Sequence, residues 1–244
     1  MTETEWFNSW FDTRYYSLLY KERDDKEAKI FVNKLTSHFD VAKGTKVLDL
    51  GCGTGRLSRL LSDAGMKVTG TDINENVLQK AKSLSNSKIK YLVNDSRDPF
   101  PEANFGMIIS FFTSFGYFES DEEHNQVIRN VREALNWGGV FVLDFLNAHL
   151  AEQELPWKGE TECEGVNFKI SKQIINGYFV KDIEVIDNGK EFHYQEKVRY
   201  FTMSELKKMF QSNGLQVNGC FGDYQLNAFE LEKSKRLILT GTKK

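Results

Sequence analysis

The segment from Val47 to Arg56 reads Val-Leu-Asp-Leu-Gly-Cys-Gly-Thr-Gly-Arg, and it limits what this chain can fold into more than any other part. A short apolar run enters three closely spaced glycines, and a helical pattern of apolar residues follows from Leu57. Glycine tolerates positive φ and lets the backbone approach a ligand closely. The first N–H groups of a helix have no partner inside that helix. The segment therefore predicts a strand, a tight turn and a helix whose N-terminus faces a nucleotide-like ligand.

Apolar runs and helical spacings alternate on both sides of this turn. The runs that predict strands lie at residues 46–50, 67–71, 89–93, 105–111 and 140–145. The spacings that predict helices lie at residues 21–39, 57–64, 75–84 and 121–135. Repeated strand–helix units are typical of an α/β fold, so we expect a doubly wound, mostly parallel sheet with helices on both faces.

The pattern changes after Asn147. Polar and apolar side chains alternate at 168–175, 178–185 and 191–200, and the Asn-Gly pairs between these runs are a hairpin signal. This predicts a small antiparallel β insert of about three strands. A capping box from Thr202 to Glu205 then predicts a helix that runs to Gln211. Two further runs, at 215–226 and 236–240, complete a seven-stranded sheet with an antiparallel C-terminal hairpin.

Acidic residues stand at the ends of three successive predicted strands. Asp49 lies just before the glycine turn, Asp72 ends the second strand and Asp95 follows the third. Open α/β sheets bind ligands at this edge, and a carboxylate at the tip of the second strand can accept both hydroxyls of a ribose. Asp95 can accept from an adenine amine, with the backbone of Ser96 beside the ring. Each acid alone is more typical of a solvated loop, but three in register predict an adenosine site.

The glycine turn by itself also fits a dinucleotide site. The dinucleotide fingerprint places its third glycine one position later, where Arg56 stands. That substitution disfavours NAD and FAD, because pyrophosphate binding and helix–strand packing both favour glycine there. A nicotinamide-dependent oxidoreductase and a non-catalytic cofactor-binding protein stay open as alternatives.

Residues 47–58, Gly70-Thr-Asp72 and Asn94-Asp95 resemble the sequential motifs of class I S-adenosylmethionine-dependent methyltransferases. The last two predicted strands, closing with residues 237–241, resemble the C-terminal hairpin of that family. The resemblance implies a Rossmann-like fold, S-adenosyl-L-methionine as cofactor, and methyl transfer to a small-molecule acceptor. It places Asp49 near the methionine ammonium, Asp72 on the ribose and Asp95 on the adenine. The cofactor-binding residues that it implies are Asp49, Gly51, Cys52, Gly53, Gly55, Asp72, Ile73, Asp95, Ser96 and Phe111.

The segment 110–118, Ser-Phe-Phe-Thr-Ser-Phe-Gly-Tyr-Phe, resembles the part of small-molecule N- and O-methyltransferases that passes the donor and lines the acceptor pocket. The Asn/Asp-Pro-Pro-Tyr/Phe motif of DNA amino-methyltransferases is absent here, which disfavours base methylation. Core packing is an equal alternative for Phe112 and Phe118. The residues that we expect in the substrate pocket are Tyr16, Phe112, Thr113 and Tyr117.

These patterns divide the chain into three parts. Residues 1–40 are a helical, aromatic N-terminal cap, residues 41–150 and 201–244 are the S-adenosylmethionine-binding domain, and residues 151–200 are the β insert. The cofactor fold requires neither the cap nor the insert, so we expect both to cover the active site. Packing against the sheet's helices is an equal alternative for the aromatic residues of the cap. The residues expected to form a lid are Trp6, Trp10, Phe11, Tyr15 and Tyr16.

Methyl transfer from a sulfonium depends mainly on alignment, although an acceptor that loses a proton can use a base. The sequence does not determine a catalytic residue. The candidates are His149, His193 and Tyr200, with Tyr194 as a further one, and a surface histidine is the alternative interpretation. We expect His38 and His124 on solvated helix faces.

Charge and composition disfavour other partners. With 32 basic and 35 acidic residues the net charge is -3, which offers no field that attracts nucleic acid. The three cysteines have neither metal-binding nor disulfide spacing. No run is long enough to span a membrane, and the N-terminal residues lack a secretory pattern. We therefore expect a cytoplasmic protein without a metal, with a small-molecule partner and neither nucleic acid nor a membrane; its oligomeric state is open.

Overall fold

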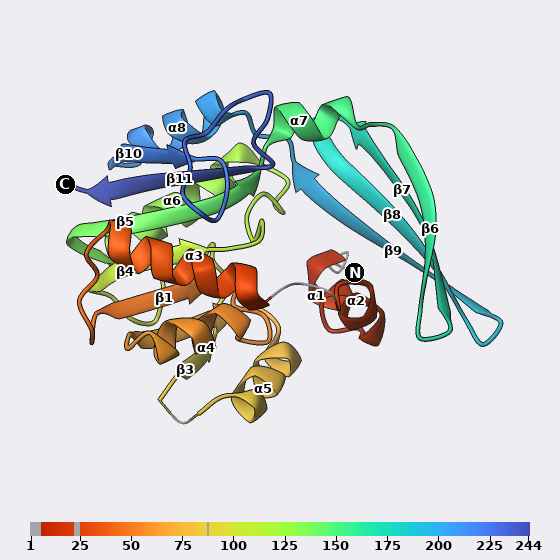
Figure 1. Ribbon diagram of the computed structural model, residues 1–244, viewed down its shortest axis with the longest axis horizontal. Helices are drawn as coiled ribbons and strands as arrows, with labels where there is room; N and C mark the ends of the chain where they lie inside the picture. The colour runs from red at the N-terminus through yellow and green to blue at the C-terminus, as the bar shows by residue number, and fades with distance from the viewer. Residues whose placement is uncertain (1–5, 22–24, 87) are drawn as a thin grey trace.

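A computed structural model of the chain describes residues 6–21, 25–86 and 88–244. Its main part is a seven-stranded sheet in the order β10-β11-β5-β4-β1-β2-β3 (Figure 1). The five strands β1 to β5 are mutually parallel, and β10 and β11 form an antiparallel hairpin beside β5. The strands are β1 (Lys46–Leu50), β2 (Lys67–Asp72), β3 (Lys90–Val93), β4 (Phe105–Ser110), β5 (Leu135–Leu146), β10 (Leu215–Phe221) and β11 (Arg236–Lys243). The predicted fold class is confirmed.

Helices cover both faces of this sheet, because its central strands are apolar on both sides. Leu48, Ile108 and Phe141 point to the face covered by α6 (Asp121–Ala134) and α8 (Met203–Ser212). Val47, Met107 and Val142 point to the other face. That face is covered by α3 (Asp25–His38), α4 (Arg56–Asp63) and α5 (Glu75–Leu84). Among the described residues, no helix has the length and apolarity needed to cross a bilayer.

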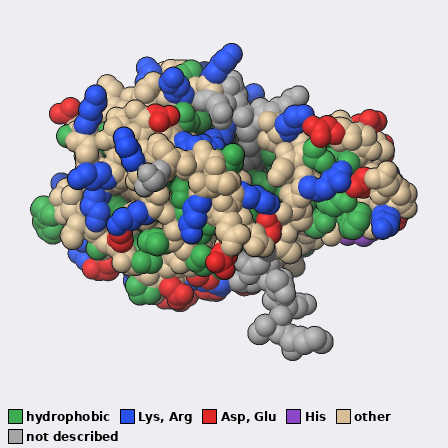
Figure 2. Space-filling view, turned by 90° about the horizontal axis from the view of Figure 1, so that it is seen from below, with side chains coloured by type: hydrophobic (Ala, Val, Ile, Leu, Met, Phe, Trp, Pro, Cys, Tyr) green, Lys and Arg blue, Asp and Glu red, His purple; other side chains and the backbone are tan. Residues whose placement is uncertain are grey.

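The β insert is a separate antiparallel sheet in the order β6-β7-β8-β9. Its strands are β6 (Trp157–Cys163), β7 (Val166–Ile175), β8 (Tyr178–Asp187) and β9 (Lys190–Arg199). The sequence predicted three strands and missed β6, because this edge strand is mostly exposed and does not alternate. Both Asn-Gly turns have two successive positive φ angles, as two-residue hairpin loops require. Figure 2 shows the insert as a smaller lobe beside the larger one.

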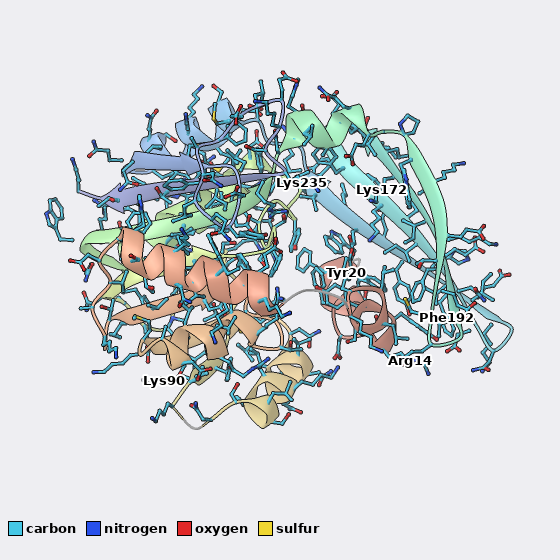
Figure 3. All side chains as sticks on the ribbon, in the orientation of Figure 1. Arg14, Tyr20, Lys90, Lys172, Phe192 and Lys235 are labelled. Atoms are coloured by element: carbon cyan, nitrogen blue, oxygen red, sulfur yellow. The ribbon has the colours of Figure 1, made fainter. Side chains whose placement is uncertain are left out.

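Two short helices of the cap, α1 (Trp6–Trp10) and α2 (Arg14–Leu19), lie between the two sheets (Figure 1). Trp10 and Tyr15 are buried in an apolar cluster with residues of β7 and β8. The indole of Trp10 also donates to Glu196 at 2.8 Å, and the hydroxyl of Tyr15 donates to Asp187 at 3.0 Å. Figure 3 shows Arg14 and Phe192 on these facing elements. The cap is therefore packed on one face of the insert.

Several predicted boundaries differ from those in the structure. Strand β4 ends at Ser110, not at residue 111, because Phe112 and Thr113 take positive φ. Strand β5 begins at Leu135, not at residue 140, and includes the Gly138-Gly139 pair. Strand β10 ends at Phe221, and a loop follows up to β11. The helix α7 (Ala148–Gln153) was not predicted.

The expected solvent exposure of His124 is wrong. Its side chain is fully buried against Phe115, Phe118 and Phe201. Its Nδ1 lies 2.7 Å from the carbonyl oxygen of Ser120, and the N–H of Phe118 donates to its Nε2 at 3.4 Å. Burial lowers the pKa of His124, so the folded protein holds the neutral ring.

Acidification should therefore destabilise the fold through His124. The unfolded chain gains a proton near the usual histidine pKa of 6.5, whereas the folded chain resists it. Stability should fall below that pH by at most about 1.4 kcal/mol per pH unit. Urea unfolding of the wild type and of His124→Gln over this range measures the slope. The exposed His38 provides the control variant His38→Gln, and a slope that His124→Gln does not reduce would contradict this prediction.

Candidate functional site

The glycine turn joins β1 to α4 at the end of the sheet where the parallel strands finish, beside the cap (Figure 1). Gly51, Gly53 and Gly55 all have positive φ. A Cβ on Gly55 would overlap the ring of Tyr91, so the turn cannot carry a side chain there. A Cβ on Gly53 would meet no atom within 4 Å, so the backbone at Gly53 faces open space. The thiol of Cys52 is buried at the base of the turn.

Asp72, at the end of β2, holds the glycine turn. Its Oδ2 accepts the N–H of Gly53 at 2.9 Å, and its Oδ1 accepts the N–H of Asn74 at 3.0 Å. Burial raises the pKa of Asp72, and these backbone donors partly offset the rise. The side chain stays partly exposed, as does its neighbour Ile73. The carboxylate of Asp72 thus holds the backbone of both the glycine turn and the loop before α5, at the edge of the sheet where a ribose is predicted to bind.

Asp49 is buried directly beneath the turn. Its Oδ2 accepts from the hydroxyl of Ser58 in α4. Burial raises the pKa of Asp49 to about 6, against the opposing effect of the Ser58 hydrogen bonds. This carboxylate therefore changes charge close to neutral pH.

The pKa of Asp49 predicts a pH-dependent affinity for the donor. If the ionised carboxylate holds the methionine ammonium, donor affinity should fall by about tenfold per pH unit below pH 6 and level off above it. Calorimetric titration with S-adenosylhomocysteine from about pH 5 to about pH 8 measures the profile. Asp49→Asn should bind weakly with little dependence on pH. An unchanged profile in that variant would assign the titration to another group.

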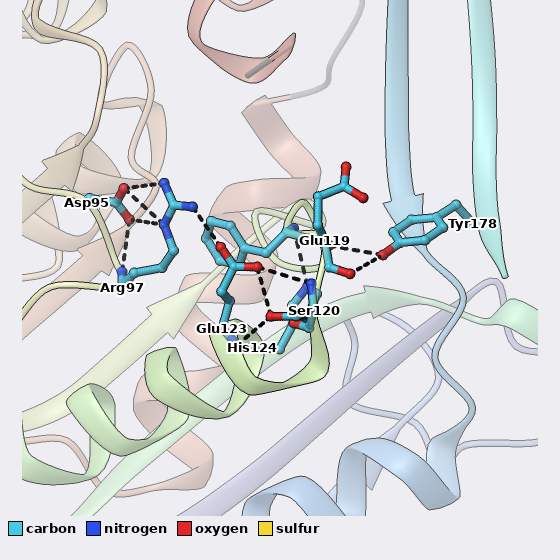
Figure 4. Close-up of polar contacts among 8 residues, drawn as sticks. Asp95, Arg97, Glu119, Ser120, Glu123, His124 and Tyr178 are labelled. Carbon is cyan, nitrogen blue, oxygen red and sulfur yellow. Dashed lines mark hydrogen bonds and ion pairs between the residues drawn. The ribbon is translucent and has the colours of Figure 1, made fainter. Parts of the chain in front are cut away.

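Asp95 follows β3 and lies in a network that reaches the segment after β4 (Figure 4). Arg97 forms an ion pair with Asp95 at 2.6 Å and a second with Glu123 of α6 at 2.9 Å. Burial alone would raise the pKa of Asp95, but the hydrogen bonds from Arg97 outweigh it and lower the pKa. The guanidinium of Arg97 also lies 4.7 Å from the centre of the Phe118 ring. Asp95 is therefore ionised, and Arg97 links it to the segment 110–118.

The loop that carries Ser96 is held by α6. The amide of Asn130 donates to the carbonyl oxygens of Ser96 and Asp98, each at 2.9 Å. The sequence does not predict these two hydrogen bonds, because a polar residue in the middle of α6 gives no sign of which loop it contacts.

Aromatic side chains of the cap meet the segment after β4. The ring centres of Trp6 and Tyr117 lie 5.0 Å apart, and those of Phe11 and Tyr16 also lie 5.0 Å apart. Phe11 contacts Tyr117 at 5.8 Å, which joins the two pairs. All four side chains are half-buried. We call this group the aromatic wall, defined by Trp6, Phe11, Tyr16 and Tyr117.

Phe111, which was predicted to bind the cofactor, and the two remaining predicted pocket residues, Phe112 and Thr113, contact other parts of the chain than the aromatic wall. Phe111 is stacked on Phe31 of α3 at 4.9 Å and is buried, so its place is in the packing behind the turn. Phe112 lies beneath the guanidinium of Arg56, 4.3 Å from it. Thr113 accepts from Arg236 at 2.9 Å. Donor contact by Phe111 and acceptor contact by Phe112 and Thr113 stay predictions.

The structure does not bring the three catalytic candidates to the glycine turn. His149 pairs with Glu232 at 2.9 Å on the surface. His193 is exposed, on the face of the insert opposite to Tyr194 and the cap. The hydroxyl of Tyr200 donates to Glu152 of α7 at 2.9 Å. A catalytic role for any of them stays a prediction without geometric support.

The sequence analysis also missed a buried group around Asp144. This residue is fully buried in β5 and pairs with Arg236 of β11 at 2.7 Å. The hydroxyl of Tyr224 donates to the same carboxylate at 3.1 Å. A charged residue inside the apolar run Val-Phe-Val-Leu-Asp-Phe was the available signal, since a buried charge needs partners.

These residues fit an adenosyl donor. Three carboxylates stand at successive strand ends, and the backbone at Gly53 faces space that a side chain would fill. That Asp72 receives the ribose hydroxyls, Asp95 the adenine amine and Asp49 the ammonium stays a prediction. This arrangement agrees with the ligand position of open α/β sheets.

Comparison with known proteins also indicates a donor of this kind. A family described as methyltransferase domain matches residues 47–139. A Haemophilus influenzae protein named probable S-adenosyl-L-methionine-dependent methyltransferase TehB is 34% identical over 208 residues, covering 78% of this chain and 68% of that protein. A solved S-adenosylmethionine-dependent methyltransferase from Clostridium acetobutylicum has a TM-score of 0.81 at 18% identity, covering 94% of this chain and 96% of that one. CalS10, an amino pentose methyltransferase from Micromonospora echinaspora, has a TM-score of 0.73 at 18% identity, covering 95% and 98%.

Proposed function

The chain belongs to the S-adenosylmethionine-dependent methyltransferases, and from that premise we propose that it methylates a small molecule through a nitrogen or oxygen nucleophile. The observation that carries this proposal is the aromatic wall. It lies where the cap meets the segment after β4, next to the end of the sheet that carries the glycine turn. A site framed by half-buried rings suits a compact acceptor better than an extended polymer.

S-adenosylmethionine supplies a methyl group on a positively charged sulfonium, so the protein mainly has to align the nucleophile with it. Alignment of this kind can contribute roughly 7–11 kcal/mol. We assign the holding of the donor to Asp72, Asp95 and the glycine turn. The aromatic wall contributes faces that attract cations, which favours an amine acceptor. No base is assigned, because the candidate side chains contact other groups or face away from the cap.

The cap and the insert are proposed to close the site. The cap contacts the insert through Trp10 and Glu196 at 2.8 Å. It contacts α5 through Asp12, which accepts from Lys80 at 2.9 Å and from Asn76 at 2.8 Å. Because α5 begins shortly after Asp72, these contacts span the edge where the donor would lie. Such a cover excludes water from the reacting groups.

A mass-shift screen tests the acceptor class. The purified protein is incubated with a methyl-deuterated donor and with separate small-molecule, protein and nucleic-acid fractions of a cell extract, and labelled products are identified by mass spectrometry. We expect the label in an amine or hydroxyl compound, with less formed by Asp72→Ala at a limiting donor concentration. Label that appears only in protein or nucleic acid would contradict the proposal. The aminosugar acceptor in the name of CalS10 makes amino sugars the first compounds to include.

A further inference from the structure

The turn that follows β4 has an unusual backbone for its sequence. Phe112 and Thr113 have φ angles of 54° and 63°. This left-handed region costs free energy for residues with a Cβ, and a β-branched residue such as threonine rarely adopts it. Two such residues in succession persist only where the surrounding structure holds them. The turn therefore needs a brace.

A buried carboxylate provides that brace. The Oδ2 atom of Asp144 accepts the N–H of Phe112 at 2.8 Å, and its backbone carbonyl accepts the N–H of Thr113 at 3.1 Å. The carboxylate also accepts from Tyr224 at 3.1 Å and from the Nε of Arg236 at 2.7 Å. The Nη2 of Arg236 donates to the hydroxyl of Thr113 at 2.9 Å. Asp144 thus ties both strained residues to the C-terminal part of the chain.

The braced turn packs directly on the glycine turn. The hydroxyl of Ser114 lies 3.4 Å from the carbonyl oxygen of Gly51. A Cβ built on Gly51 would lie only 2.8 Å from the Cβ of Ser114. On the other side, Arg56 at the start of α4 covers the ring of Phe112. A shift of the braced turn would therefore move the walls of the glycine turn.

We propose that Asp144 is a positioning residue for the methyl donor: with Arg236 and Tyr224 it holds Phe112 and Thr113 against the glycine turn. The inference rests on the proposed function only in taking the glycine turn as the donor site. Asp144 does not touch the donor and acts only through Phe112 and Thr113. A site held in place before binding gains affinity, because less conformational freedom is lost when the ligand arrives.

The first test is calorimetric titration with S-adenosylhomocysteine. Asp144→Asn should bind about tenfold more weakly than the wild type, with one ligand per folded chain. Tyr224→Phe removes one hydroxyl but keeps the ring beside Phe111, so it should show a smaller loss even if Asp144→Asn fails to fold. The control is Glu102→Gln. Glu102 accepts from Lys90 at 2.7 Å, at the opposite end of β3 (Figure 3), and its substitution should leave the affinity unchanged.

A second-site variant separates positioning from general stability. Asparagine tolerates the left-handed region better than threonine and still offers an oxygen to Arg236. Thr113→Asn should therefore restore part of the affinity lost in Asp144→Asn or Tyr224→Phe. If the brace variants lower Tm but leave the affinity of the folded chains unchanged, the inference is overturned. The same follows if Thr113→Asn restores nothing. Binding of S-adenosylhomocysteine requires no acceptor. This test therefore stays valid even if the acceptor is not a small molecule with a nitrogen or oxygen nucleophile.

Discussion

Asp72→Ala should weaken the binding of S-adenosylhomocysteine by on the order of 1–3 kcal/mol, the cost of leaving buried polar groups without partners. The family resemblance assigns this carboxylate to the ribose hydroxyls. In the structure it also accepts the N–H groups of Gly53 and Asn74. The substitution therefore removes a ligand contact and loosens the glycine turn at the same time. Isothermal titration calorimetry measures the loss, which corresponds to roughly 5- to 150-fold in Kd.

Two companion variants show whether the loss is specific to the carboxylate of Asp72. Asp72→Asn keeps an acceptor oxygen for one backbone N–H, so it should retain more affinity than Asp72→Ala. Glu75→Ala removes an exposed acid at the first residue of α5 and should have no effect. Unchanged affinity in Asp72→Ala, or an equal loss of affinity in Glu75→Ala, would contradict the assignment of Asp72 to the ribose.

Gly53→Leu should abolish measurable donor binding while the protein stays folded. A Cβ at this position meets no atom of the chain within 4 Å, so the side chain would extend into the space in front of the turn. If the donor occupies that space, affinity should fall by on the order of 100-fold or more. The left-handed backbone at Gly53 adds a strain of about 1–2 kcal/mol. Donor titration together with thermal unfolding separates the two effects.

The chain offers a matched control for the strain. Gly44 lies in the turn before β1, also has positive φ, and also has no atom within 4 Å of a built Cβ. Gly44→Leu should lower stability by a similar amount, about 1–2 kcal/mol, and leave donor affinity unchanged. Equal donor affinity in Gly53→Leu and Gly44→Leu would show that the space at Gly53 is not part of the donor site.

The sequence predicted the sheet well, because its information is local and periodic. Apolar runs identified the parallel strands, and the Thr202 capping box marked the start of α8, where both of its hydrogen bonds are present. Strand β6 and helix α7 were missed. The first is an exposed edge strand, and the second has a single buried residue, so neither shows a periodic apolar face.

The candidate site residues also fall into those that local sequence could predict and those that it could not. Asp49, Asp72 and the glycines lie within one strand–helix–strand unit, so their spacing in the chain already determines that they meet at one edge of the sheet. The structure shows no such proximity for the catalytic candidates, so their role stays a prediction. His149, His193 and Tyr200 were chosen by residue type and rough position, and each contacts a surface partner or faces away from the cap.

The sequence by itself determined the family and the donor and predicted the residues that hold it, because these depend on a short motif that folds as one unit. Only the tertiary structure decided what surrounds that motif. The cap meets the insert through Glu196, far along the chain. Asp144 and Arg236 each form a hydrogen bond with Thr113, and Tyr224 donates to Asp144, although these residues are distant in sequence. Hydrogen bonds between such segments leave no periodic signal in the chain, since they depend on how the finished sheets and helices pack together.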